Sequence, residues 1–289
     1  MKGIILAAGK GTRLYPVTIP VCKPLVPVYD KPLIYYPLTV LMDAGIDDIL
    51  VITPPDDTKP FINTLGDGSR FGIKIRYLEQ QVQRGIADAF IIGADFIGTD
   101  SVALALGDNI FYGPAFRKKL RQAKNLSKEG AAIFGYYVPD PRAFGVVEFD
   151  SNNKAISIEE KPKHPKSNYI VPGLYFYDNQ VVEIAKNIGP SARGELEITS
   201  VNNEYLKMNK LNVIALDDSF SWFDAGNADS LYKAAGAVRA AQRSGKMIGC
   251  PEETAFRNHW IDLMQLNELA KNMKSSAYGG YLEAMIEEA

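Results

Sequence analysis

Apolar and polar residues alternate along the first half of the chain in a pattern that predicts strands followed by helices. Short apolar runs bounded by turn residues predict strands at residues 4–7, 49–53, 74–78, 102–106 and 131–136. Helical spacing predicts helices at residues 33–44, 86–92 and 115–126, and a short helix that Asp56 and Asp57 cap and that ends at residue 65. This alternation predicts a parallel sheet with helices on both faces, whose ligands bind beyond the carboxyl ends of the strands.

The pattern changes after residue 145. The sequence predicts strands at residues 146–149, 155–159, 170–177 and 212–216, with helices at residues 195–208 and 227–243. After Pro251 the chain is amphipathic and helical throughout. We therefore expect a Rossmann-like α/β domain over residues 1–250, with a mostly parallel mixed sheet flanked by helices and further strands inserted into it. Residues 251–289 are expected to form a helical C-terminal appendage.

Composition narrows the classes of function. The 289 residues are 46% hydrophobic, enough for a sizeable core, and the formal net charge of -2 argues against a nucleic-acid or membrane surface. No apolar run approaches a membrane span, and residues 4–8 are too short for a signal peptide. Cys22 and Cys250 form no pair motif, which favours a cytoplasmic protein. His164 and His259 lie at no metal-ligand spacing, which favours surface or capping roles.

The loop after the first predicted strand carries the first candidate chemistry. Gly9, Gly11, Thr12 and Arg13 combine exposed backbone N–H groups with a planar cation, a combination suited to phosphate. The loop does not fit the dinucleotide fingerprint, which needs a glycine where Leu14 stands. It does not fit the Walker A loop either, because Lys10 precedes a glycine rather than serine or threonine. A phosphate loop of neither kind points to nucleotidyl transfer, the alternative being an ordinary tight turn.

Two aspartates follow predicted apolar or aromatic strands. Asp108 lies in the segment 106–109, Leu-Gly-Asp-Asn, and Asp224 lies in 222–226, Trp-Phe-Asp-Ala-Gly. Carboxylates at strand ends supply the hard oxygen ligands that Mg²⁺ binds together with waters and substrate phosphates. The competing interpretation is that each aspartate is a turn residue. Lys23-Pro24 and the segment 159–162, Glu-Glu-Lys-Pro, add charged groups at two further places.

Taken together, these segments resemble the sugar-1-phosphate nucleotidyltransferases. The resemblance rests on Gly-x-Gly-Thr-Arg-Leu with Lys23-Pro24, on Leu-Gly-Asp-Asn, on Glu-Glu-Lys-Pro and on Trp-Phe-Asp-x-Gly. Further matches run through nearly the whole chain, at residues 29–32, 34–37, 65–68, 107–113, 144–150, 165–169, 173–178, 191–199 and 250–253. Long matches in register make chance similarity improbable. The resemblance implies a nucleotide-binding part over about residues 1–130 and a sugar-binding part over about residues 131–230.

The resemblance also implies roles for individual residues. Those expected to bind the nucleotide are Ala8, Gly9, Gly11, Thr12, Arg13, Gln80, Gly85 and Asp108, with Gln80 reading a pyrimidine base. Those expected at the reacting phosphates are Arg13, Lys23 and Asp108, with Asp108 and Asp224 binding Mg²⁺. Those expected to hold the sugar phosphate are Asn109, Gly145, Glu160, Lys161, Val171, Tyr175 and Arg193.

The implied reaction transfers a thymidylyl group from dTTP to glucose 1-phosphate and releases pyrophosphate, with Mg²⁺ as cofactor. The sequence leaves open the same reaction with UTP, because a glutamine amide reads uracil as well as thymine. It also leaves open a subunit that senses sugar nucleotides without catalysis. A dinucleotide-dependent oxidoreductase is disfavoured by the loop. The chain departs from the family pattern at Ala8, Pro24, Arg84 and Ala225, where glycine, glutamine, aspartate and threonine are usual.

The segment after Pro251 carries more apolar positions than a solvated tail would: Ile261, Leu263, Leu266, Leu269 and Leu282. These side chains pack either on their own domain or on another subunit. The resemblance to long-form members of the family implies a homotetramer, with a second, regulatory site for the end product dTDP-rhamnose at a subunit interface.

Overall fold

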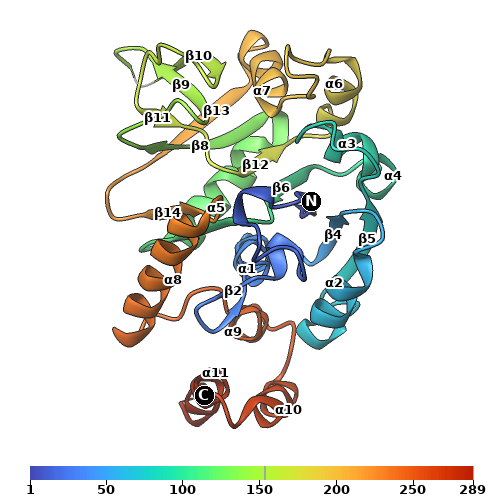
Figure 1. Cartoon of the computed structure of the whole chain (residues 1–289), viewed down its shortest axis with the longest axis vertical. Coiled ribbons are helices and arrows are strands. Elements are labelled where there is room, and N and C mark those ends of the chain that lie inside the picture. The colour runs from blue at the N-terminus through green and yellow to red at the C-terminus, as the bar shows by residue number, and fades with distance from the viewer. Residues whose placement is uncertain (153, 289) are drawn as a thin grey trace.

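The computed structural model describes residues 1–152 and 154–288, and a ten-stranded mixed sheet runs through its centre (Figure 1). The strands of this sheet are β1 (Lys2–Leu6), β4 (Asp48–Thr53), β5 (Lys74–Glu79), β6 (Val102–Leu106), β8 (Ala131–Tyr137), β9 (Gly145–Phe149), β10 (Ala155–Glu160), β11 (Tyr169–Ile170), β12 (Leu174–Tyr177) and β13 (Leu211–Leu216). Their order is β10-β9-β11-β8-β12-β6-β1-β4-β5, with β13 pairing in parallel with β8. The predicted fold class is confirmed.

The strands β6, β1, β4 and β5 are parallel neighbours, as the alternating pattern predicts. Successive residues of these strands enter different hydrophobic clusters: Ile4 and Leu50 lie on one face, and Ile5 and Val51 on the other. Both faces of the sheet are therefore buried, which explains why these strands appear in the sequence as continuous apolar runs.

Helices cover both faces. The helices of the described residues are α1 (Tyr35–Asp43), α2 (Thr58–Leu65), α3 (Asp88–Ile92), α4 (Ala94–Ile97), α5 (Phe116–Leu126), α6 (Val181–Asn187), α7 (Ile198–Lys207), α8 (Ala228–Arg243), α9 (Pro251–Arg257), α10 (Leu263–Met273) and α11 (Ala277–Glu287). Side chains of α1, α2, α5 and α9–α11 enter the cluster on one face, and those of α3, α4, α6 and α7 the cluster on the other. The sequence analysis predicted neither α4 nor α6.

The single strand predicted at residues 170–177 is wrong, because β11 and β12 are separated by Val171, Pro172 and Gly173. Proline has no N–H to give to a ladder, and the Gly173 N–H donates to Asn109 Oδ1 at 3.1 Å. The break between β11 and β12 lies beside the end of β6. There the Gly173 N–H bonds to a side chain and not to a neighbouring strand.

The helix predicted to begin at residue 195 begins at Ile198 instead. Leu196 is held in an extended conformation by the loop before α3: its N–H donates to Arg84 O at 2.6 Å, and its carbonyl accepts from Ala87 N at 3.1 Å. These two bonds satisfy backbone groups that a helix would otherwise use, so the helix starts after them.

Two short antiparallel ribbons lie outside the main sheet. One pairs β2 (Pro27–Val28) with β3 (Lys31–Pro32), and the other pairs β7 (Asn109–Tyr112) with β14 (Ser221–Asp224). The apolar side chains of β2, β7 and α8 form a third, smaller cluster that includes Val28, Ile110 and Val238. The second ribbon joins the end of β6 to the start of α8, and this joint shapes the candidate site.

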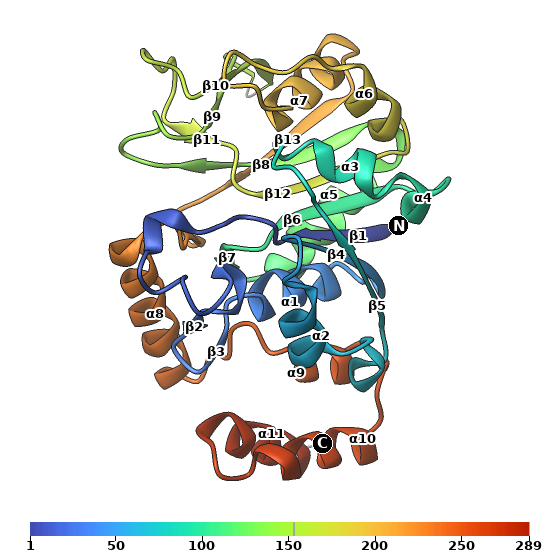
Figure 2. The same ribbon diagram turned by 45° about the vertical axis from the view of Figure 1, so that its right-hand side comes forward.

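The C-terminal helices α10 and α11 lie at the end of the molecule opposite α6 and α7 (Figures 1 and 2). Ile261, Leu266 and Leu282 are buried within the chain's own core cluster, whereas Leu263 and Met264 are exposed. The alternative that this segment packs on its own domain therefore accounts for most of its predicted apolar positions. None of the helices in residues 1–152 and 154–288 is long and apolar enough to cross a membrane.

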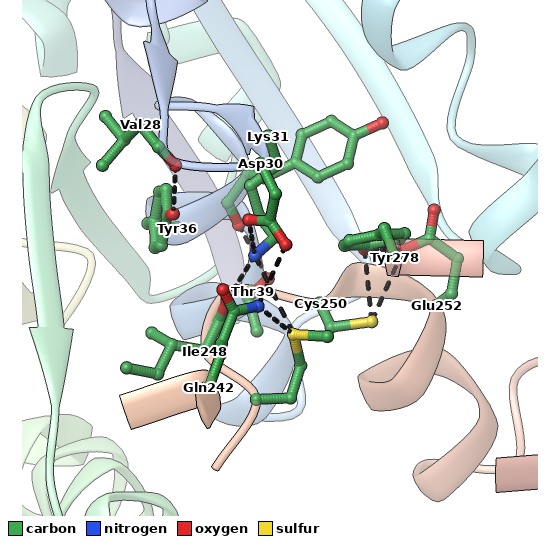
Figure 3. A network of polar contacts seen from close by, with 12 residues as sticks. Val28, Asp30, Lys31, Tyr36, Thr39, Gln242, Ile248, Cys250, Glu252 and Tyr278 are labelled. Atoms are coloured by element: carbon green, nitrogen blue, oxygen red, sulfur yellow. Dashed lines mark hydrogen bonds and ion pairs between the residues drawn. The ribbon is translucent and has the colours of Figure 1, made fainter. Parts of the chain in front are cut away.

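A buried polar network ties these helices to the β2–β3 ribbon (Figure 3). Lys31 donates to Asp30 at 2.7 Å and to Ile248 O at 3.0 Å, and its ammonium lies 5.3 Å from the centre of the Tyr278 ring. The Tyr278 hydroxyl donates to the buried Glu252 carboxylate. Burial raises the pKa of Glu252 above its ordinary value of 4.5.

We expect the stability advantage of a Glu252→Gln variant to grow with pH. Because the pKa of Glu252 is raised from 4.5 in the folded state, the folded protein binds this proton more tightly than the unfolded chain does. The unsubstituted protein therefore loses stability as pH rises from 4.5 to the raised pKa, and a glutamine, which does not titrate, avoids this loss. Urea unfolding at intervals up to about pH 8 measures the difference, and a constant difference would contradict the expectation.

Candidate functional site

The glycine loop leaves the carboxyl end of β1, as the sequence predicts. Gly11 has a φ of 63°, and a Cβ there would lie 2.9 Å from the Lys23 side chain, so only glycine fits without strain. A Cβ on Gly9 would meet nothing within 4 Å, so its backbone faces open space. Thr12 and Arg13 follow in a short 3₁₀ turn. The loop therefore offers open backbone and a cation at the edge of the sheet.

A buried lysine meets a carboxylate at the next strand end. Lys23 opens a 3₁₀ turn, is 6% exposed, and forms an ion pair with Asp108 Oδ2. Asp108 follows β6, whose neighbour in the sheet is β1, so the pair lies close to the glycine loop that leaves the end of β1. This ion pair lies beside the glycine loop, at the edge of the sheet where ligands bind, and not in the apolar layer between the sheet and its helices.

The β7–β14 ribbon brings the second aspartate to the first. Asp224 pairs with Asn109 in the ladder, and Ala225 N donates to Asp108 O at 3.0 Å. Burial and the neighbouring Asp108 carboxylate raise the pKa of Asp224. A Cβ on Gly226 would lie 2.9 Å from Asp224 Oδ2 and 3.2 Å from Arg13 Nη2, so the glycine lets these two side chains approach. The carboxylates of Asp108 and Asp224 and the cations of Lys23 and Arg13 therefore lie close together.

Asn109 holds this joint together. Its amide donates to Asp108 Oδ1 at 2.7 Å, while its oxygen accepts from Trp222 Nε1 at 2.6 Å and from Gly173 N at 3.1 Å. Asn109 is 3% exposed. Its side chain lines the candidate sugar cavity, but these protein partners already occupy its polar atoms.

The cavity next to this joint has a volume of about 240 Å³. Another cavity, of about 310 Å³, lies elsewhere in the molecule. The residues that line the cavity next to the joint include most of the predicted sugar set: Asn109, Gly145, Glu160, Lys161, Val171 and Tyr175, together with Arg13, Asp108 and Asp224. The N–H of Val171 donates to Gly145 O at 2.8 Å, so this N–H is already engaged.

The far wall of this cavity is charged. Thr199 Oγ1 donates to Glu160 Oε2 at 2.6 Å, and Lys161 Nζ lies 3.7 Å from Glu160 Oε1. Arg193 Nη2 lies 3.6 Å from Glu160 Oε1 and donates to Glu197 at 2.8 Å, and the Glu197 carboxylate raises the pKa of Arg193. The structure therefore places Arg193 near Glu160, although it is not among the residues lining the cavity.

A second cavity of about 150 Å³ adjoins the first on the side of the glycine loop. It is lined by Leu6, Ala7, Gly9, Lys23, Pro24, Leu106, Gly107 and Asp108. Leu106 and Asp108 line both cavities, so the two hollows meet at the Lys23–Asp108 pair.

The predicted base-reading residues lie farther along the same sheet edge. Gln80 follows β5, and Gly85 has a φ of 107°, with its Cα so close to Leu196 that a Cβ would lie 2.5 Å from Leu196 O. Gln83 Nε2 donates to Ala8 O at 2.7 Å, which ties this loop to the glycine loop. The residues predicted to bind the base, the phosphates and the sugar therefore follow one another in that order along the edge of the sheet.

Sequence reasoning assigned no role to Thr199, Trp222 or Gln83, although the first two lie in segments that carry the family resemblance. Their parts in the site are tertiary hydrogen bonds to Glu160, Asn109 and Ala8. The described residues contain no group of three or more His, Cys, Asp or Glu side chains arranged for a metal ion. A metal at Asp108 and Asp224 would need waters and substrate phosphates to complete its ligands.

Comparison with known proteins identifies the class. A family model for nucleotidyl transferases matches residues 2–241, and the chain belongs to this family. It is 55% identical over 288 residues to a glucose-1-phosphate thymidylyltransferase of Mycolicibacterium smegmatis, covering 99% of each chain. It is 54% identical over 289 residues to the enzyme of that name from Neisseria meningitidis, covering 100% of each.

Solved structures agree with this assignment. A Bacillus anthracis protein assigned as a glucose-1-phosphate thymidylyltransferase, solved in complex with a sucrose, has a TM-score of 0.77 and 43% identity, covering 83% of this chain and 95% of that one. A UDP-glucose pyrophosphorylase complexed with UDP-glucose has a TM-score of 0.70 at 23% identity, covering 83% of this chain and 98% of that one. The latter supports the fold alone.

Proposed function

We propose that this protein transfers a thymidylyl group from dTTP to glucose 1-phosphate, giving dTDP-glucose and pyrophosphate. The observation that carries the proposal is the identity of 54–55% over the full chain with relatives named for this reaction. The site supports it, because two adjoining cavities meet at Lys23 and Asp108. The first suits a sugar phosphate and the second the phosphates of a nucleotide.

In this reaction an oxygen of the sugar phosphate attacks the α-phosphorus of dTTP. A new P–O bond forms as the bond from the α-phosphorus to the bridging oxygen breaks, and pyrophosphate leaves with that electron pair. The attacking phosphate oxygen is already anionic near neutral pH, so no general base is needed. The work of the site is to bring two polyanions together and to balance charge in the transition state.

The cations are distributed for that work. Lys23 lines the second cavity, and Arg13 reaches the first cavity from the glycine loop. Both would hold the triphosphate and the leaving pyrophosphate, together with the loop of Gly9, Gly11 and Thr12. Lys161 and Arg193 lie on the sugar side and hold the phosphate of glucose 1-phosphate. Glu160, Gly145 and the backbone at Val171 hold the glucose hydroxyls, with Asn109 and Tyr175 close by.

The chemistry of Asp108 and Asp224 fits a divalent cation, which we propose is Mg²⁺. Two hard carboxylates lie close together, and burial and then the Asp108 charge raise the pKa of Asp224. Bound there, Mg²⁺ would screen the triphosphate from the sugar phosphate and stabilise charge on the transferring phosphoryl group. Lys23, which already pairs with Asp108, would orient that carboxylate.

The first prediction concerns the substrates. With glucose 1-phosphate, dTTP and UTP should release pyrophosphate and ATP and GTP should not, because the amide of Gln80 complements the edge of a pyrimidine base. A coupled pyrophosphate assay over five nucleotides measures this, and glucose 1-phosphate is replaced by glucose as a control. Efficient turnover with ATP or GTP would refute the assignment, and no turnover with any nucleotide would favour a sensing subunit.

The second prediction concerns the metal ligands. Asp108→Asn and Asp224→Asn preserve size but each remove one anionic ligand, so Mg²⁺ affinity and turnover should fall by about 100-fold or more. The thermal midpoint of the metal-free protein should stay level or rise for Asp224→Asn, because a carboxylate repulsion is removed. Asp218→Asn, an exposed change near Asp224 in sequence, serves as the matched control. If turn formation were the only role, both variants would keep near-normal turnover at limiting Mg²⁺.

We further propose a place for the protein in the cell. The two cysteines, Cys22 and Cys250, are both free, which suits a cytoplasmic enzyme that supplies dTDP-rhamnose and polysaccharide biosynthesis. We propose that residues 1–250 act as the catalytic domain, with nucleotide binding mainly in residues 1–130 and sugar binding in residues 131–230. Residues 251–289 would then serve in assembly.

The third prediction is a homotetramer inhibited by dTDP-rhamnose at a second site. It is supported by the exposed side chains of Leu263 and Met264, which remain after Leu266 and Leu282 are buried in the chain's own core. Light scattering at micromolar concentration gives the assembly, and initial rates with added dTDP-rhamnose give the inhibition. A monodisperse monomer would overturn the first half, and unchanged rates the second.

A further inference from the structure

The amide of Gln80 is held in one orientation by a buried carboxylate. Gln80 Nε2 donates to Asp88 Oδ2 at 2.9 Å and lies 3.4 Å from Gly85 O. Asp88 opens α3 and is 1% exposed, so this contact is shielded from water. A carboxylate accepts hydrogen bonds and has none to donate, so it must face the NH₂ end of the amide and not the oxygen end.

A third residue fixes the carboxylate. Arg84 Nη2 donates to Asp88 Oδ1 at 2.7 Å, an i,i+4 pair across the turn at Gly85. Each oxygen of Asp88 therefore has one donor, Arg84 on one side and Gln80 on the other.

The orientation leaves one atom of Gln80 for a ligand. Within residues 1–152 and 154–288, no side-chain or backbone donor is bonded to Gln80 Oε1. This oxygen is also absent from the buried polar atoms of those residues that lack a partner, so it retains contact with solvent. Gln80 is 4% exposed, and Oε1 is the atom of its amide left for a ligand, because the amide donors are directed to Asp88 and Gly85.

Pyrimidine bases differ in what they offer to such an acceptor. Thymine and uracil carry a hydrogen on N3, whereas N3 of cytosine is an acceptor with no hydrogen. An acceptor fixed opposite N3 accepts a hydrogen bond from thymine or uracil. Opposite cytosine the same acceptor faces the lone pair on N3. A free glutamine amide would rotate by half a turn and donate to cytosine, so discrimination depends on whatever prevents that rotation.

We infer that Asp88, held by Arg84, is a positioning residue that fixes the carbonyl oxygen of Gln80 toward the base and makes the site select pyrimidine nucleotides with an N3–H over CTP. The inference rests on the proposed function, because it takes Gln80 as the base reader. Base recognition then has two parts: Gln80 contacts the base, and Asp88 determines which atom of Gln80 makes the contact.

The experiment compares kcat/KM for dTTP, UTP and CTP in matched variants. In Asp88→Asn the new amide can donate to Gln80 Oε1 as readily as it accepts from Nε2, so Gln80 is free to rotate. The dTTP:CTP ratio should then fall about tenfold or more. The dTTP:UTP ratio should not change, because both bases carry the N3–H. Asp95→Asn, an exposed carboxylate on the neighbouring α4, is the charge-matched control and should alter neither ratio.

A double variant tests the orientation itself. In Gln80→Glu with Asp88→Asn, the carboxylate and the amide exchange places, and an oxygen faces the base whichever way the side chain turns. The dTTP:CTP ratio should therefore recover toward the value of the unsubstituted protein. A residue that mattered only for folding would show no such recovery. Gln80→Ala gives the dTTP:CTP ratio that remains when the side chain of residue 80 forms no hydrogen bond with the base.

The outcomes separate this inference from the proposed function. No turnover of the unsubstituted protein with dTTP would refute the function. Turnover with dTTP whose dTTP:CTP ratio is unchanged by Asp88→Asn would refute the positioning role alone. If Asp88→Asn does not fold, as judged by its thermal midpoint, the double variant decides: a retained dTTP:CTP ratio supports the inference, and a tenfold lower one overturns it.

Discussion

The pairing of β7 with β14 is the contact on which the candidate site depends. It joins residues far apart in the sequence, and its register sets Asp224 opposite Asn109, next to Asp108. Without it the two carboxylates would lie on separate loops. The ribbon is short, and Asn109 compensates by bonding to Asp108, Trp222 and Gly173 at once. The positions of the charged groups are thus set by a neutral, buried amide, whose bonds do not depend on salt.

The charges at this joint oppose and balance one another. Two carboxylates that lie together repel, and the raised pKa of Asp224 reflects both this repulsion and its burial. Lys23 offsets part of the cost by pairing with Asp108, and Arg13 approaches Asp224 across Gly226. A substrate triphosphate would compete for the same cations. The site therefore has charge partners ready for its substrates, which lowers the reorganisation needed when they bind.

Much of the fold could be predicted because the apolar pattern of each strand in the sequence matches the burial of its residues in the structure. Ile4 and Ile5 enter clusters on opposite faces of the sheet, and a strand buried on both sides has the continuous apolar run that the sequence displays. The same reasoning located Asp108, because a charged residue directly after such a run lies at the sheet edge.

The features that could not be predicted are those set by distant partners. Residues 171–173 interrupt a strand because Gly173 donates to Asn109, and residues 195–197 stay extended because Leu196 pairs with the Arg84 segment. Neither effect leaves a periodic signal. The convergence of Asp108 with Asp224 likewise followed from resemblance and not from spacing, since no local pattern specifies which strand β14 joins. Tertiary hydrogen bonds decided all three cases, to the Asn109 side chain in the first and between backbone groups in the other two.

The C-terminal helices are joined to the phosphate side of the site through the β2–β3 ribbon. Lys31 lies in that ribbon, and its ammonium is held by Asp30, by Ile248 O and over the rings of Tyr36 and Tyr278. The ribbon follows directly on the turn that carries Lys23. Because Lys31 is 3% exposed, none of these partners can shift without leaving a charge buried and under-bonded. The network therefore connects Tyr278 of α11 to the ribbon that begins two residues after the turn of Lys23–Leu25.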